Sequence, residues 1–252
     1  IPFPSSRIPR KNRKVPFCNS FWGLKDLLTL KSILQKDSLT DRMVKKCRIL
    51  RSNIFREEML MDYCFISKAG NREINEDCIG IAEGKDCICF VVADGLGGHG
   101  KGDIASKLAT SEFQKVFEAS AGPSLEERLE KAFENAQSAI LAEQQRQNSN
   151  FQMKTTVAAV AIDHSSAICG YIGDTRVYLF FKNRITQRTV DHSVPQMLVL
   201  AREIKEKQIR HHPDRNKLLR VLGTQGDVRF DSFSTDLKKC QAILLCSDGF
   251  WE

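Results

Sequence analysis

Short apolar runs, each bounded by polar or glycine-containing turns, recur along residues 62–252. Runs of this length, rich in Val, Ile, Phe and Tyr, are typical of buried strands. The seven strands predicted in this way are Tyr63–Ser67, Cys78–Ala82, Cys87–Ala93, Thr155–Ile162, Ala167–Gly173, Val177–Phe181 and Ala242–Cys246.

Two helical patterns lie between the third and fourth of these runs. Their apolar residues recur at helical spacing: Ala105, Leu108, Ala109, Phe113, Val116 and Phe117, then Leu125, Leu129, Ala132, Phe133, Ala136 and Ile140. Ser124 and Glu127 form a capping box at the start of the second helix. Two adjacent helices argue against strict β-α-β alternation. We therefore predict an α+β fold, a four-layer α-β-β-α sandwich with two antiparallel sheets flanked by helices.

Charge divides the chain near residue 61. Residues 1–61 contain 14 Lys and Arg against 5 Asp and Glu, a net charge of +9, whereas residues 62–252 contain 24 against 26, a net charge of −2. We predict a basic leader at 1–61, disordered or foreign to the native protein, and one domain at 62–252. A basic arm that binds nucleic acid or acidic lipid is the alternative for the leader. No nucleic-acid partner is expected for the domain.

Hydropathy and cysteine usage predict a cytoplasmic protein without a membrane span, and we expect it to be a monomer. No run approaches the ~20 apolar residues of a transmembrane helix. The apolar residues around Phe21 to Leu34 are interrupted by Lys25, Asp26 and Lys31, so no signal peptide is predicted. Nine cysteines without a C-x-x-C pair argue against zinc and a disulfide framework. Core thiols in a reducing cytosol explain them.

The stretch Val91–Gly102 is an apolar strand that ends on Asp94 and continues into a glycine-dense turn. Such a turn can present main-chain groups to an ion or a phosphate. Gly95, Gly97 and Gly100 fit the dinucleotide pattern G-x-G-x-x-G, so a glycine-loop nucleotide-binding protein is one alternative. The second strand and acidic residue that this pattern requires about 20 residues later are replaced by helix.

Carboxylates at other strand ends favour a metal site. Asp77 closes a polar turn, Asp174 lies between two apolar runs, and Asp248 repeats the strand-Asp-Gly pattern of Asp94. Mg²⁺ and Mn²⁺ take oxygen ligands, and water completes the octahedron. Any single Asp-Gly pair is explained equally well by an ordinary turn. Four such carboxylates, with Arg72 beside the first, indicate a divalent-metal site.

Taken together, these motifs resemble the metal-dependent PPM-type (type 2C) serine/threonine protein phosphatases in their bacterial form. They occur in the family's order over about three quarters of the chain: Arg72-x-x-Asn75-Glu76-Asp77, Val92-Ala93-Asp94-Gly95-Leu96-Gly97-Gly98-His99, Thr155-Thr156, Gly173-Asp174-Thr175-Arg176, Thr189-x-Asp191-His192-Ser193 and Ser247-Asp248-Gly249. The resemblance implies that a metal-activated water hydrolyses phosphoserine and phosphothreonine. The implied partners are phosphoproteins modified by an opposing serine/threonine kinase.

The resemblance also implies metal ligands. Asp94 would bridge two Mn²⁺ or Mg²⁺ ions, and the Gly95 carbonyl would add an oxygen. Asp248 would bind one of these ions, and Asp77 would hold metal directly or through a water. Asp174 would bind a third, weaker ion that it shares with Asp248.

Two further residues would act on the substrate. The guanidinium fork of Arg72 suits the phosphate oxygens. His99 would either protonate the leaving group or order its own loop, and both roles stay open. The family also carries a flap beside the cleft, which here corresponds to Val194–Leu222.

The chain departs from the family at its end. The family's last metal ligand is an Asp in a later Asp-Asn pair, whereas this sequence ends at Glu252. We therefore expect the domain to be incomplete at its C-terminus, with its last strands missing. The corresponding alternative is a catalytically impaired binding or regulatory module that lacks this ligand.

Overall fold

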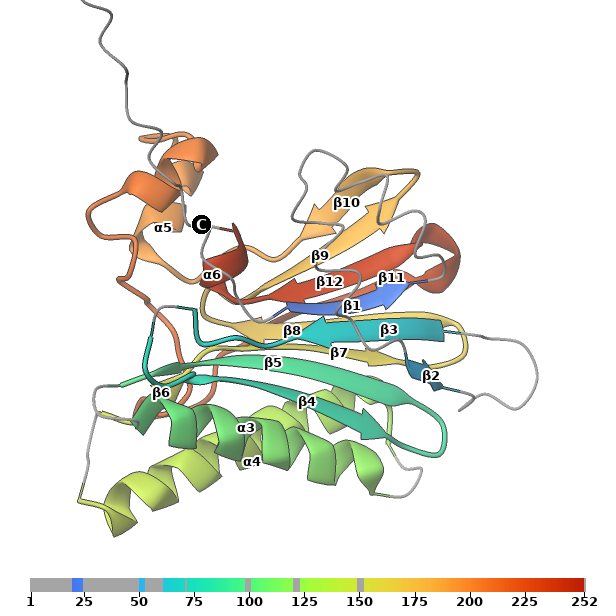
Figure 1. Cartoon of the computed structure of the whole chain (residues 1–252), viewed down its shortest axis with the longest axis horizontal. Coiled ribbons are helices and arrows are strands. Elements are labelled where there is room, and N and C mark those ends of the chain that lie inside the picture. Colours follow the sequence, from blue (N-terminus) through green and yellow to red (C-terminus); the bar gives the residue numbers. More distant parts are fainter. Residues whose placement is uncertain are drawn as a thin grey trace, which may run out of the picture.

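The computed structural model describes residues 20–24, 50–52, 61–70, 72–97, 101–119, 123–148 and 152–251. Two stacked sheets form its centre, and two long helices cover one of them (Figure 1). The first sheet has the order β10-β9-β12-β1-β3-β2, and the second has the order β11-β8-β7-β5-β4, with β6 paired to β5. All of these pairings are antiparallel.

The strands have the following bounds: β1 Ser20–Leu24, β2 Leu50–Ser52, β3 Met61–Ile66, β4 Asp77–Glu83, β5 Ile88–Leu96, β6 Lys154–Thr155, β7 Val157–Ile162, β8 Ser166–Ile172, β9 Arg176–Phe181, β10 Arg184–Arg188, β11 Asp231–Asp236 and β12 Ala242–Cys246. The helices are α3 Lys101–Glu118, α4 Leu125–Arg146, α5 Val194–Leu200 and α6 Asp248–Trp251, with short 3-10 helices η1 Glu206–His211 and η2 Leu237–Lys239. No helix in the described part of the chain is long and apolar enough to cross a membrane.

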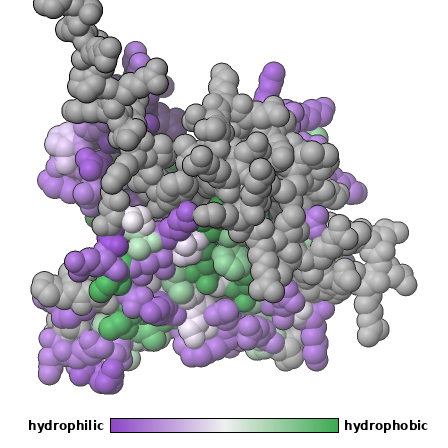
Figure 2. Space-filling view, in the orientation of Figure 1, coloured by the Kyte–Doolittle hydropathy of each residue, from purple (hydrophilic) through white to green (hydrophobic). Residues whose placement is uncertain are grey.

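The continuous apolar run of β5 reflects burial of both of its faces. Cys89, Val91 and Ala93 belong to the core beneath α3 and α4, whereas Phe90 and Val92 belong to the core between the sheets. Side chains alternate between the faces of a strand, so a strand covered on both sides carries apolar residues at every position. The outer surface over α3 and α4 is mainly hydrophilic (Figure 2).

The α4 helix begins as predicted. The Ser124 side chain accepts a hydrogen bond from the Glu127 backbone N–H, and the Glu127 carboxylate accepts one from the Ser124 N–H. Below this cap, Phe133 packs edge-on against Phe113 of α3 and stacks on Phe230, with centroid distances of 5.0 and 4.2 Å. These contacts fix both helices on the second sheet.

The structure confirms the α+β class with two antiparallel sheets flanked by helices. The predicted run Thr155–Ile162 is divided at Thr156 into β6 and β7, and the sequence analysis missed the polar strands β10 and β11. Within residues 1–61, β1 and β2 belong to the first sheet, where β1 lies between β3 and β12. The division of the chain near residue 61 stays a prediction.

Candidate metal-dependent active site

Asp77 and Asp94 lie opposite each other in the sheet. They are register partners at one end of the antiparallel pair β4 and β5. Directly opposed residues place their side chains on the same face, with Cβ atoms about 5 Å apart. The register alone therefore brings together two of the predicted ligands.

Two threonines hold the backbone of Asp94. The Asp94 carbonyl accepts hydrogen bonds from the Thr156 N–H at 2.9 Å and from the Thr155 hydroxyl at 2.8 Å. The Asp94 N–H donates to the Thr156 hydroxyl at 3.3 Å. Both threonines are fully buried. Their hydroxyls fix the position of Asp94, so these residues do more than extend a strand.

Gly95 allows the start of α3 to approach the end of β5. A Cβ on Gly95 would lie 2.2 Å from the Gly102 carbonyl oxygen and 2.6 Å from that of Glu76. All three of the nearest atoms belong to main chain, which cannot move aside as a side chain does. Gly95 therefore permits close packing of the main chain next to Asp94.

The other two predicted ligands come from the ends of β12 and β8. Asp248 is the first residue of α6, and the preceding Ser247 donates a hydrogen bond from its hydroxyl to Asp77 Oδ2 at 2.9 Å. Asp174 follows Gly173, whose φ of +99° makes the turn between β8 and β9. Positive φ of this kind favours glycine.

Burial and neighbouring carboxylates raise the pKa values of Asp94 and Asp174. Burial, followed by the charges of Asp77, Asp248 and Asp174, raises the pKa of Asp94 well above its usual value. Burial, followed by the charges of Asp248 and Asp191, raises the pKa of Asp174 to about 8. Such mutual repulsion in a buried site is relieved when a cation binds between the carboxylates.

The donor set suits a hard divalent cation. In the described residues, no three Asp, Glu, His or Cys side chains are grouped so as to hold a metal ion by themselves. Mg²⁺ in proteins usually binds through one or two carboxylates and keeps several waters. The paired carboxylates of Asp77 and Asp94, and of Asp174 and Asp248, fit this mode of binding.

Of the two residues predicted to act on the substrate, the structure describes Arg72. The Arg72 side chain is 67% exposed and forms an ion pair with Glu76 at 3.7 Å. Arg72 therefore lies close to the start of β4, where Asp77 is located. His99 lies outside the described residues, so its role stays a prediction.

The Asp191-His192-Ser193 triplet has structural contacts that the sequence analysis did not assign. Asp191 pairs with Arg176, and the Ser193 hydroxyl accepts from the Gln196 N–H at the start of α5. His192 Nδ1 accepts from the Gly173 N–H at 3.1 Å, and Nε2 lies 3.1 Å from Asp231 Oδ2. The triplet thus supports the turn that carries Asp174. The sequence pattern alone did not reveal these contacts.

Fold and site together define a phosphatase of the PPM class. The family model described as Protein phosphatase 2C matches residues 67–252. The chain belongs to the protein phosphatase 2C family. The prediction of a bacterial PPM-type phosphoprotein phosphatase is confirmed, and the nucleotide-binding alternative is not supported.

Named relatives agree with this assignment. The serine/threonine phosphatase stp of Listeria welshimeri serovar 6b is 34% identical over 183 residues, which cover 71% of this chain and 73% of the relative. The crystal structure of the serine/threonine phosphatase Stp1 from Staphylococcus aureus is similar with a TM-score of 0.64 and 27% identity, covering 77% of this chain and 72% of that one.

A third comparison concerns fold alone. The catalytic domain of the serine/threonine protein phosphatase PstP, solved in complex with 2 manganese ions, has a TM-score of 0.60 and 24% identity. The similarity covers 80% of this chain and 76% of that one.

Proposed function

We propose that the chain hydrolyses phosphoserine and phosphothreonine in proteins with the help of Mn²⁺ or Mg²⁺. The observation that supports this most strongly is that Asp77 and Asp94 are directly opposed in the sheet, where burial and the charges of Asp77, Asp248 and Asp174 raise the pKa of Asp94. A buried group of like charges destabilises the protein unless a cation binds it. When bound, the ions supply a water of lowered pKa and neutralise charge that develops on the phosphate.

The residues have distinct roles in this proposal. Asp94 and the Gly95 carbonyl would hold two ions, Asp248 would bind one of them, and Asp77 would hold metal directly or through a water. Asp174, with Asp248, would hold a third ion. The threonine hydroxyls and Ser247 orient Asp94 and Asp77, so the carboxylates are in place before an ion arrives.

Arg72 is the proposed phosphate ligand. Its exposed side chain can leave the 3.7 Å ion pair with Glu76 and bind phosphate oxygens through two N–H groups. His99 is proposed as the general acid, with loop ordering as the alternative. The substrates are phosphoproteins, and the free thiols of the described cysteines suit a reducing compartment such as the cytosol.

The test is hydrolysis of a phosphothreonine peptide with and without Mn²⁺. We expect turnover that requires the metal, and a loss of at least about 100-fold in kcat in Asp94→Asn and Asp248→Asn, the scale on which loss of charge stabilisation acts. Asp227→Asn, at an exposed carboxylate away from the cluster, should match the wild type. Normal rates in either ligand variant would contradict the metal assignment. Metal binding without turnover would favour the binding or regulatory module.

A further inference from the structure

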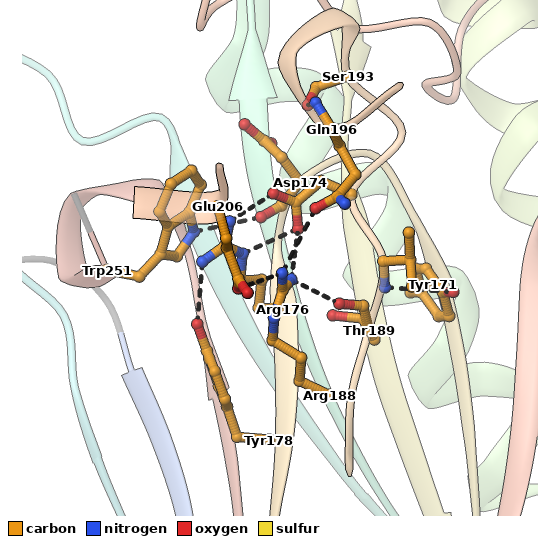
Figure 3. Close-up of polar contacts among 12 residues, drawn as sticks. Tyr171, Asp174, Arg176, Tyr178, Arg188, Thr189, Ser193, Gln196, Glu206 and Trp251 are labelled. Atoms are coloured by element: carbon orange, nitrogen blue, oxygen red, sulfur yellow. Dashed lines mark hydrogen bonds and ion pairs between the residues drawn. The ribbon is translucent and has the colours of Figure 1, made fainter. Parts of the chain in front are cut away.

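Arg176, two residues after Asp174, forms a buried ion pair with Asp191. Arg176 donates to both carboxylate oxygens of Asp191, from Nε at 2.8 Å and from Nη2 at 2.5 Å, and both side chains are buried. The Trp251 ring stacks 3.4 Å from the Arg176 guanidinium, and its Nε1–H donates to the Asp174 carbonyl at 3.3 Å (Figure 3). Asp174 is thus tied to Arg176 both along the chain and through Trp251.

Arg188, the last residue of β10, contacts this pair from the other side. Its Nη1 lies 3.5 Å from Asp191 Oδ1 and donates to the Thr189 carbonyl at 2.8 Å. Its Nη2 reaches Gln196 of α5 at 3.4 Å and forms an ion pair with Glu206 of η1 (Figure 3). A guanidinium can serve all of these acceptors together because its N–H groups point in several fixed directions.

These contacts join the flap segment, residues 194–222, to the metal-binding turn. Both α5 and η1 belong to the flap segment, and Arg188 bonds to each of them while it also touches Asp191. We propose that Arg188 is a positioning residue that docks the flap segment against the Asp174 turn and so shapes the protein-substrate side of the active site. The inference rests on the proposed function, which gives Asp174 its role, and on the family resemblance, which identifies residues 194–222 as the flap beside the cleft.

The ion pairs on the two sides of Arg188 differ in strength. The Asp191 side chain is fully buried, so its ion pairs with Arg176 and Arg188 are shielded from water. Glu206 is 60% exposed, so its ion pair with Arg188 contributes little to stability. The flap segment can then release from Arg188 without unfolding the turn that carries Asp174. Docking is reversible, and its equilibrium depends on the Arg188–Glu206 pair.

Hydrogen exchange tests this inference independently of turnover. Glu206→Ala should speed amide exchange in residues 194–211 by about 1.5- to 5-fold, the range expected for loss of one exposed ion pair. Lys207→Ala is the matched control, because Lys207 is an exposed residue of the same short helix. The double variant Arg188→Lys, Glu206→Ala should exchange no faster than the more affected single variant, because residues in one interaction do not add.

Kinetics supply the second readout. In Glu206→Ala, KM for a phosphothreonine protein should change by a similar factor while kcat is retained, whereas a simple loss of folded enzyme would lower kcat alone. Equal flap exchange in Glu206→Ala and Lys207→Ala, or additive effects in the double variant, would overturn the inference. If the wild type lacks turnover but the exchange results hold, the docking role stands and the proposed function fails.

Discussion

Replacing Asp174 by asparagine should stabilise the metal-free protein at alkaline pH. The pKa of Asp174 is about 8 in the folded protein against 3.8 as its usual value, chiefly because the carboxyl is buried and secondarily because Asp248 is near. An acid with a raised pKa binds more protons when folded, so its stabilising effect is complete below pH ~4 and is lost as the pH rises to about 8. Asparagine has a similar shape and no charge.

The expected magnitude follows from this shift. One pKa unit corresponds to about 1.4 kcal/mol, so the wild type should lose up to about 4 kcal/mol between pH 5 and pH 8 that the variant retains. The variant also lowers the pKa of Asp94, because Asp174 is one of the charges that raise it. The difference between the two proteins is the relevant quantity, since other carboxyls titrate in both.

Urea denaturation in the presence of a chelator, at pH 5, 6, 7 and 8, provides the assay. Asp227→Asn controls for loss of one exposed carboxylate. Adding Mn²⁺ at pH 8 should stabilise the wild type more than Asp174→Asn, because the ion replaces the proton among the carboxylates. Parallel pH profiles for the two proteins, or a less stable variant at pH 8, would refute the reasoning.

Two predictions concern packing. Gly95→Ala places a methyl group 2.2 Å from the Gly102 carbonyl, so we expect a loss of about 3 kcal/mol or more in unfolding free energy and weaker stabilisation by Mn²⁺ in thermal melts; a wild-type melting temperature would contradict this packing. Phe133→Ala should cost about 3–5 kcal/mol in urea denaturation, because the ring is fully buried between Phe113 and Phe230. An exposed truncation, Leu200→Ala, should change stability by less than about 0.5 kcal/mol.

Burial explains which elements the sequence could predict. The run Ala242–Cys246 coincides with β12 because every residue in it is buried, and an apolar run is then the natural signal. The strands β10 and β11 lie at sheet edges and carry exposed, polar residues, so hydropathy gave no sign of them. Edge strands with polar side chains resist pairing with other chains. Because these strands lack an apolar run, hydropathy does not predict them.

The sequence predicted the acidic residues of the candidate site, because each lies in a recognisable local pattern. Asp94 and Asp248 each lie at the end of an apolar run, and that local pattern identified them. The connection from Asp191 through Arg188 to Glu206 depends on side chains that meet only after β9, β10 and the flap segment have packed. No spacing in the sequence encodes such contacts. Family resemblance supplied ligand roles but did not supply this connection.

Because Asp77 is paired with Asp94, ion binding at these residues would report whether β4 and β5 have the correct register. A slip of one residue between β4 and β5 would turn one carboxylate to the opposite face of the sheet. A misregistered chain would retain its strands and much of its core, yet it would lose the proposed ion site. Titration with Mn²⁺ could therefore count the molecules in a preparation whose sheet is correctly aligned, even when their secondary-structure content is the same.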